Sequence, residues 1–254
     1  MRLPRRLRYG EEATLVEHLD ELRMRLFVAL GGLALAFIVA FVFHRRLIHW
    51  LELALPKERR QLVTFSVGEP FLTSVWVSLY AGLLLALPII LWQLWAFLMP
   101  AVEERHQRRI LAFVAVASAL LVAGVFFGYY VGLPKALQFL TNYDDQVFKV
   151  QIRARDYLSF ATAMLLAFAL VFELPIFVVA LVSLGVLSSR TLRRQRRVGY
   201  FIVACVAVAL PGIDPVTTTI ETIPLLILFE GSIWASVLFE RRSGRFEPAG
   251  VSEP

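Results

Sequence analysis

The sequence has almost no cysteine and none of the side-chain clusters that mark common catalytic or metal centres. Its single cysteine, Cys205, has no partner for an intramolecular disulfide, and its four histidines are scattered along the chain. No serine sits in a nucleophile elbow, no glycine-rich loop can hold a phosphate, and no pair of residues has metal-ligand spacing. We therefore expect neither enzymatic activity nor a bound metal or cofactor.

Charge is scarce as well. Charged residues make up 18% of the 254 residues and hydrophobic residues 58%, whereas a soluble domain is typically about 45–50% apolar. A helix crosses the hydrocarbon core of a bilayer, about 30 Å thick, with roughly 20 apolar residues. Several charge-free segments reach that length, so the sequence predicts an integral membrane protein. The basic residues are divided among short segments, which argues against nucleic acid as a partner.

Six apolar segments predict an all-α fold with six transmembrane helices in one domain, 1–242, followed by a disordered cytoplasmic tail, 243–254. The approximate spans are 24–44, 70–99, 110–133, 157–184, 198–213 and 222–239. The fifth is uncharged over only 16 residues, about 24 Å as a helix. Glu221 and Glu230 restrict the sixth to a short helix beginning at Thr222. Two short spans side by side predict local thinning of the bilayer.

The distribution of lysine and arginine predicts that both ends of the chain are cytoplasmic. Segments on the side of the N-terminus carry 17 of these residues and segments on the other side carry 9, and the cytoplasmic side is normally the richer one. The segment 45–68 is an exception to this rule, because it lies on the other side and still carries five basic residues. This segment and 134–156 are long enough to form structured caps outside the membrane.

Near the N-terminus, Thr14 and Glu17 form a capping-box pattern ahead of leucines at helical spacing. This pattern predicts an amphipathic helix that leads into the first span. Glu17, Glu21 and Arg25 follow at i, i+4 intervals, which is ordinary for a solvated helix. A carboxylate at this position can equally accept a guanidinium from a partner, and the spacing does not separate the two interpretations.

Glu173 interrupts the fourth predicted span. A carboxylic acid at the centre of an apolar span costs several kcal/mol unless it is protonated, faces a polar cavity or finds a partner. Gln93, which is also predicted inside the membrane, is a candidate partner. Glu173 is therefore either a satisfied structural acid or a functional group.

The residues His18-Leu-Asp-Glu-Leu-Arg-Met-Arg-Leu26 resemble the N-terminal motif of the TatC family, the multispanning receptors of the twin-arginine protein translocase. Further resemblances occur in order along the chain. They are Glu69-Pro-Phe71, the segment 88–100, Phe172-Glu-Leu-Pro175, Asp214-Pro215 with Pro224, and Glu230.

The resemblance implies a concave six-helix protein of the cell membrane that binds the paired arginines of export signal peptides at its cytoplasmic face. It also implies assembly with single-span TatA and TatB-type subunits, self-association in a larger complex, and export of folded proteins driven by the proton-motive force. For signal-peptide binding it implies Glu21, with His18 and Arg23 of the same motif. It makes Glu173 the intramembrane acid. The outer-loop or partner-contact residues that it implies are Asp214, Thr217, Thr218, Pro70 and Phe71.

Two positions depart from the family pattern. His106 stands where the family usually places a second arginine-binding glutamate, and Glu103 and Glu104, a few residues earlier, are the candidates to replace it. Thr217-Thr218 stands where the family commonly has Ser-Gln. Two alternatives compete with a translocase subunit: a proton- or cation-coupled transporter of small solutes, motivated by Glu173, and an intramembrane enzyme.

Overall fold

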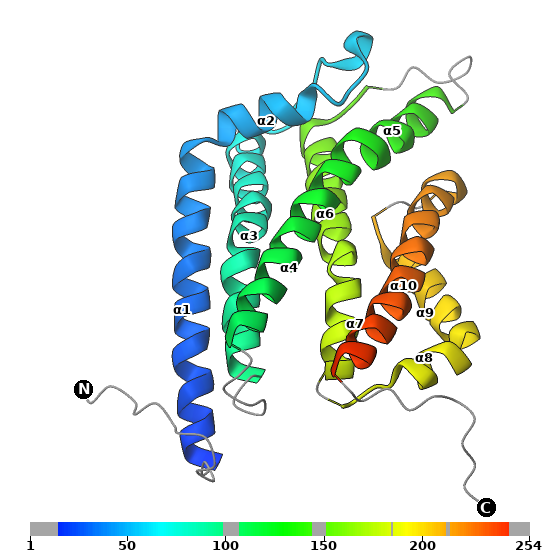
Figure 1. Ribbon diagram of the computed structural model, residues 1–254. Helices are drawn as coiled ribbons and strands as arrows, with labels where there is room; N and C mark the ends of the chain where they lie inside the picture. The colour runs from blue at the N-terminus through cyan, green and yellow to red at the C-terminus, as the bar shows by residue number, and fades with distance from the viewer. Residues whose placement is uncertain (1–14, 99–106, 144–150, 184, 212–213, 244–254) are drawn as a thin grey trace, which may run out of the picture. The chain divides into compact units, whose positions relative to one another are not determined.

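The structure, a computed structural model, describes residues 15–98, 107–143, 151–183, 185–211 and 214–243, and in these residues helices are joined by turns and short loops (Figure 1). Within these residues the β-pairing is one isolated parallel bridge between Val63 and Arg153. The all-α prediction is therefore confirmed. The chain divides into two compact units, residues 1–169 and 170–254, which are described separately.

Five helical runs are long and apolar enough to cross a membrane. They are Leu19–Val42, Glu69–Leu94, Phe113–Asn142, Ala154–Ser183 and Pro215–Arg241. Five of the six predicted spans thus have a helix of sufficient length, and the fifth predicted span does not.

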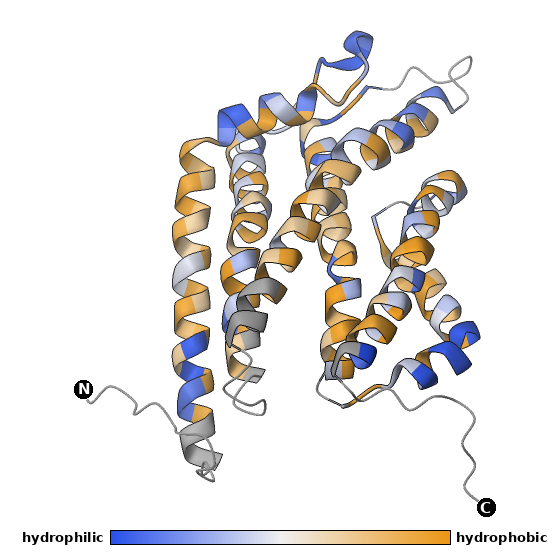
Figure 2. Cartoon of the chain, viewed as in Figure 1, coloured by the Kyte–Doolittle hydropathy of each residue, from blue (hydrophilic) through white to orange (hydrophobic). Residues whose placement is uncertain are grey.

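In unit 1, helices α1 (Leu15–Val42) and α3 (Glu69–Leu98) lie side by side. A Cβ at Gly82 would lie 2.8 Å from the Cα of Phe37, so a glycine is needed where the two backbones meet. The predicted amphipathic helix and the first span form one continuous helix, α1. Figure 2 shows polar residues near its N-terminal end and mostly apolar residues beyond them.

Helix α4 (Gln107–Phe127) continues through a π-helical turn, η4 (Gly128–Gly132), into α5 (Leu133–Asn142). The predicted third span ended at 133, and the helical run is longer because Pro134 lies in the first turn of α5, where a proline is tolerated. A Cβ at Gly132 would lie 2.5 Å from Cε2 of Phe168 on α6 (Ala154–Phe172). Glycine therefore permits the close contact of η4 with α6.

Both long connections of unit 1 contain ordered helix. Helix α2 (His44–Glu52) and the 3₁₀ turn η1 (Lys57–Arg59) follow α1, and α5 lies in the second connection. The Val63 N–H donates to Ile152 O at 3.0 Å, and the Ala154 N–H donates to Val63 O at 2.9 Å. These bonds join the two segments, and the prediction that they are structured is confirmed for their described residues, 45–68, 134–143 and 151–156.

Unit 2 contains the end of α6 and the helices α7 (Leu174–Ser183), α8 (Ser189–Arg194), α9 (Arg196–Ala209) and α10 (Pro215–Ser243). The fourth predicted span is broken at Glu173, because Pro175 has no N–H to continue the hydrogen-bond ladder. A core of Val171, Val203, Ala207 and Leu225 joins the end of α6 with α9 and α10.

Helix α9 is short, as predicted, with 14 residues, but the expectation of a short sixth helix at 222–239 is wrong. Helix α10 has 29 residues and includes both Glu221 and Pro224. It begins at Pro215 because Asp214 caps it, and Glu221 is buried within it instead of ending it. Only α9 therefore still supports bilayer thinning. The predicted tail lies outside the described residues, apart from Ser243 at the end of α10.

Candidate functional site

The first candidate site is the carboxylate of Glu21 on α1. Its Oε1 accepts hydrogen bonds from two guanidinium nitrogens of Arg25, one turn along the helix, with Nε at 3.0 Å. Each side chain is 24% exposed. Among the described residues, Oε2 of Glu21 accepts no hydrogen bond. The i, i+4 pair predicted from the spacing is present, and it leaves one carboxylate oxygen open to a further donor.

Other residues predicted for this site are only partly described. The guanidinium of Arg23 lies 5.7 Å from the ring centroid of Phe27, an exposed cation–π contact on the same helix. His18 belongs to α1, but its side chain is outside the described residues. Glu103 and Glu104 also lie outside the described residues. The structure thus brings Glu21 together with Arg25 and places Arg23 against Phe27 instead, and the predicted roles of these residues in signal-peptide binding stay predictions.

A second polar site lies at the first turn of α3, where Glu69 is buried with its side chain 3% exposed. Arg153 donates to both carboxylate oxygens, from Nε to Oε1 at 2.8 Å and from a terminal nitrogen to Oε2 at 3.1 Å. The Phe65 N–H donates to Oε2 at 3.0 Å. This hydrogen bonding to Glu69 raises the pKa of the Arg153 guanidinium above its usual value. The arrangement is a bidentate ion pair that holds the start of α3 to the segment before α6.

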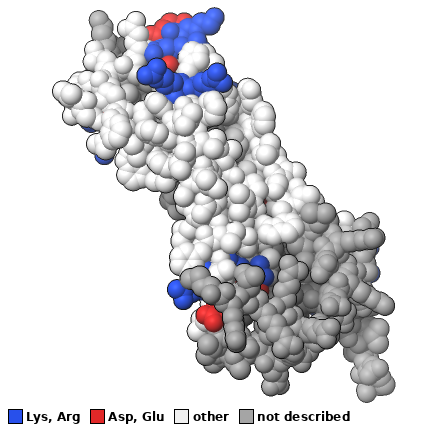
Figure 3. Space-filling view, turned by 90° about the vertical axis from the view of Figure 1, so that its left-hand side faces the viewer, with Lys and Arg blue, Asp and Glu red and all other residues white. Residues whose placement is uncertain are grey.

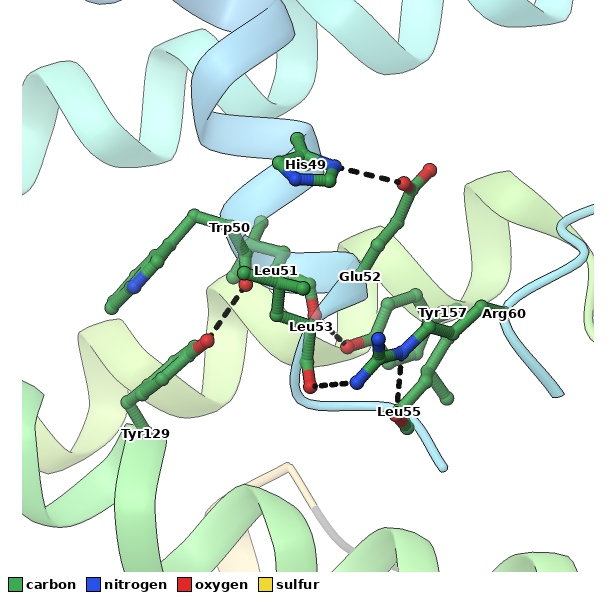
Figure 4. Close-up of polar contacts among 9 residues, drawn as sticks. All are labelled: His49, Trp50, Leu51, Glu52, Leu53, Leu55, Arg60, Tyr129 and Tyr157. Atoms are coloured by element: carbon green, nitrogen blue, oxygen red, sulfur yellow. Dashed lines mark hydrogen bonds and ion pairs between the residues drawn. The ribbon is translucent and has the colours of Figure 1, made fainter. Parts of the chain in front are cut away.

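The same region shows how α2 is held in place. Figure 4 shows the phenolic oxygens of Tyr129 and Tyr157 at the carbonyl end of α2. Tyr129 donates to Trp50 O at 2.8 Å, and Tyr157 donates to Leu51 O at 2.5 Å. The last carbonyls of a helix have no partner within it, so these two hydroxyls satisfy groups that would otherwise be unpaired.

Pro70 and Phe71, predicted as partner contacts, directly follow Glu69. Both are exposed, and Phe71 keeps 64% of its surface. The buried carboxylate of Glu69 therefore fixes the helix start from which Phe71 projects. The structure leaves Phe71 available to a partner or to lipid.

Glu173 and Glu221 are buried acids of unit 2. Glu173 is 8% exposed and Glu221 is 0% exposed. None of their four carboxylate oxygens has a hydrogen-bond partner among the described residues. The predicted bond between Glu173 and Gln93, a half-buried residue of unit 1, stays a prediction because the two residues belong to different units. Both acids occupy helical segments long enough to span a membrane, where an unpaired carboxylate is costly.

Asp214 and the two threonines that follow it form the N-terminal cap of α10. The Thr217 N–H donates to Oδ1 of Asp214 at 2.7 Å, and the Thr217 hydroxyl donates to Oδ2 at 2.5 Å. The Thr218 hydroxyl donates to Asp214 O at 3.0 Å. Pro215 occupies the first helical position, where its missing N–H has no cost. Thr217 is fully buried, so it supports the helix start and is not itself a surface contact.

Comparison with known proteins identifies the family of the chain that carries these sites. A family model described as Sec-independent protein translocase protein (TatC) matches residues 17–224. The chain belongs to the TatC family. The Sec-independent protein translocase protein TatC of Carboxydothermus hydrogenoformans is 33% identical over 222 residues, which cover 87% of this chain and 91% of that protein. The TatC protein of Deinococcus radiodurans is 34% identical over 236 residues, which cover 89% and 87%.

A solved structure supports the same family. The crystal structure of a twin arginine translocase receptor, TatC, is similar with a TM-score of 0.77 at 29% identity, covering 87% of this chain and 98% of that chain. With five long apolar helices and these relatives, the chain is a multi-pass membrane protein of the TatC family.

Several residues of this TatC-family chain were not predicted as site residues. Arg153, the partner of Glu69, is 84 residues away in the sequence, and no local pattern connects the two. Glu221 was treated only as an interruption of a span, although an acid inside an apolar run was already a signal. Glu230, which lies beyond the family match, accepts a bond from the Tyr200 hydroxyl at 2.5 Å and lies 3.4 Å from Arg196. This group pairs α9 with α10.

Proposed function

We propose that the chain is the signal-peptide receptor subunit of a twin-arginine translocase and that it is not an enzyme. Family membership supports the translocase system. The observation that carries the receptor role is the carboxylate of Glu21, which is partly exposed and has Oε2 open while Arg25 occupies Oε1. Such a carboxylate can accept a second guanidinium while its hydrogen bonds from Arg25 stay in place.

The chemistry favours arginine over lysine. A guanidinium can direct two N–H donors at the open Oε2, as Arg25 does at Oε1, whereas an ammonium is a compact point charge. Arg25 holds the Glu21 carboxylate in one rotamer through its two hydrogen bonds to Oε1, so an incoming arginine meets a positioned acceptor. Glu103 or Glu104 then receives the second arginine in place of the family glutamate at position 106.

The proposed topology has six crossings with both termini in the cytoplasm. Helix α9 supplies the crossing that the five long helices lack, at a length of about 21 Å. The Lys and Arg count of 17 against 9 supports this orientation. Glu21 then faces the cytoplasm, from which precursor proteins arrive at the cell membrane.

The proposed partners are single-span TatA and TatB-type subunits, twin-arginine signal peptides and further copies of this chain, with transport driven by the proton-motive force. Exposed Pro70 and Phe71 offer an apolar contact at the start of α3. At the start of α10, the half-buried residues Asp214 and Thr218 of the cap are the corresponding polar contact. Glu173 and Glu221 are the groups available to respond to protons inside the membrane.

The receptor role is tested with a photo-crosslinking signal peptide that carries Arg-Arg, compared with the same peptide carrying Lys-Lys. Membranes contain the wild-type chain, Glu21→Ala, or Asp20→Ala. Asp20→Ala is the matched control because it removes an exposed neighbouring carboxylate from the same helix. We expect strong labelling of wild type and Asp20→Ala by the Arg-Arg peptide alone, and weak labelling of Glu21→Ala.

Equal labelling by both peptides in all three membranes would contradict the arginine-receptor role. Solute flux through vesicles that contain only this chain, without dependence on a signal peptide, would instead support a small-solute transporter.

A further inference from the structure

A strongly basic surface lies at the end of α1 opposite to Glu21. It consists of Arg45 and Arg46 on α2 and of Lys57 and Arg59 on η1. Figure 3 shows a group of Lys and Arg atoms, with a few Asp or Glu atoms among them, at one end of this face, separated by a broad uncharged surface from a smaller charged group at the other end. Residues 44–60 contain five basic residues and two acidic ones. This segment is the exception to the charge rule used to orient the chain, because it is rich in basic residues but lies on the side opposite to the N-terminus.

The charges of this basic surface are not neutralised within the described protein. Arg45, Lys57 and Arg59 take part in no ion pair there, and the guanidinium of Arg46 lies over the Phe43 ring at 5.6 Å. Of the two acids, Glu52 lies 3.9 Å from His49, and Glu58 is exposed. A net positive field therefore remains at this surface.

The position of the surface is that of lipid headgroups. Val42, the last residue of a candidate span, is 69% exposed, and Phe43 after it is 46% exposed. These apolar side chains are stable when acyl chains cover them, so Arg45 and Arg46, within one turn, reach the headgroup layer. Arginine side chains at such a boundary place their stems on apolar surface and their charged ends among the headgroups.

The surface is also rigid. Leu51 anchors α2 because it is buried, and the Trp50 ring stacks on Tyr129 with centroids 3.8 Å apart. Arg60 donates to Leu53 O and to Leu55 O, each at 3.1 Å, which holds the chain between α2 and η1 (Figure 4). Ligand binding therefore needs little ordering of the backbone.

We propose that this basic surface binds the phosphate of anionic phospholipids in the leaflet at the α2 end of the molecule. Guanidinium groups bind phosphate through paired N–H donors, and the neighbouring exposed apolar residues receive the acyl chains. The bound headgroups also offset the repulsion among the basic residues.

The test uses Trp50, which is 36% exposed and lies four residues after Arg46 on α2, as a reporter in the full-length chain. The protein is reconstituted in vesicles of phosphatidylglycerol and phosphatidylcholine at 1:4, with bromine, a short-range quencher of tryptophan, on the acyl chains of one lipid at a time. The contribution of Trp50 is the difference from Trp50→Phe, which keeps an aromatic ring against Tyr129. We expect brominated phosphatidylglycerol to quench Trp50 beyond its share of the lipid.

Arg45→Gln/Arg46→Gln should lower this preference by roughly fivefold for each charge removed, and Arg45→Lys/Arg46→Lys should retain most of it. The control Arg193→Gln/Arg194→Gln removes two exposed charges from α8 and should leave it unchanged. Inorganic phosphate should compete no better than chloride at equal ionic strength.

Absence of the preference in wild type, its survival in the double Gln variant, or an equal loss in the α8 control would overturn the proposal. Selective competition by inorganic phosphate would identify a site for free anions instead. Thermal melting of each variant distinguishes loss of lipid binding from loss of fold.

Discussion

The two units differ in how their buried carboxylates are hydrogen-bonded. The comparison is between the cap of unit 1, meaning α2, η1, the start of α3 and the segment before α6, and the core of unit 2. Glu69 in the cap accepts bonds from Arg153 at both of its oxygens and from the Phe65 N–H at Oε2. Glu173 and Glu221 in unit 2 accept none among the described residues. A satisfied buried acid specifies geometry, whereas an unsatisfied one costs stability unless it is protonated or meets a partner. The first group therefore has a structural role, whereas the functional role proposed for the second is what the substitutions below test.

The largest expected effect is loss of stability when the cap pair is broken. Arg153→Met leaves Glu69 buried without its guanidinium, and removing one partner of a buried pair is strongly destabilising. We expect the greatest drop in Tm among the substitutions considered, measured by thermal melting in detergent. Arg155→Met, which removes an exposed arginine two residues away, is the control. A similar small drop in both variants would mean that the pair does not hold the cap.

The next effect has the opposite sign. Glu221→Leu replaces a fully buried, unpartnered carboxyl with an apolar side chain, so we expect a gain of about 1–3 kcal/mol in the free energy of unfolding. Glu240→Leu on the same helix is the matched control, because Glu240 accepts a bond from the Ser189 N–H at 2.9 Å. It should lose stability. Destabilisation by both substitutions would show that Glu221 is satisfied and would remove the contrast with the cap.

A smaller effect is expected at the start of α10. Asp214→Ala removes the acceptor of the Thr217 N–H and hydroxyl, so we expect a loss of about 1 kcal/mol, with a corresponding drop in Tm. Asp214→Asn keeps an oxygen acceptor and should lose less. If export fails in Asp214→Asn while Tm is unchanged, the carboxylate acts on a partner and not only as a cap.

The smallest effect is a difference between two substitutions of Glu173. Glu173→Gln keeps some hydrogen bonding and Glu173→Ala keeps none, so we expect roughly two- to tenfold more export of a twin-arginine precursor by the Gln variant. Export is measured in membrane vesicles under a proton-motive force. Full export activity of Glu173→Ala would show that Glu173 is a structural acid and has no role in transport.

The helices could be predicted because their signal is local. Charge-free runs located α1 and α3 to within a few residues in the apolar part. The errors came from treating single residues as helix ends. Pro134 did not end the third helical run because it falls in a first turn, and Glu221 did not end the last helix because the fold buries it. No property of either residue alone shows which outcome occurs.

The candidate sites likewise divide into those with a local sequence signal and those that the fold assembles from distant residues. Glu21 was found from a motif and a helical repeat, both of which are local. The partner of Glu69 was not found because Arg153 is 84 residues away, and the hydroxyls that cap α2 come from residues 79 and 106 positions away. Nothing in the spacing of a single sequence predicts contacts at such separations.

The sequence by itself determined that this chain is a helical membrane protein, because the length of an apolar run and the thickness of a bilayer are compared without knowing any tertiary contact. It also contained the TatC-family motif around Glu21. Only the tertiary structure decided which buried acids are paired, since a carboxylate is satisfied by whichever donor the fold brings within about 3 Å. Glu69 received its donors in this way, and among the described residues Glu173 and Glu221 did not.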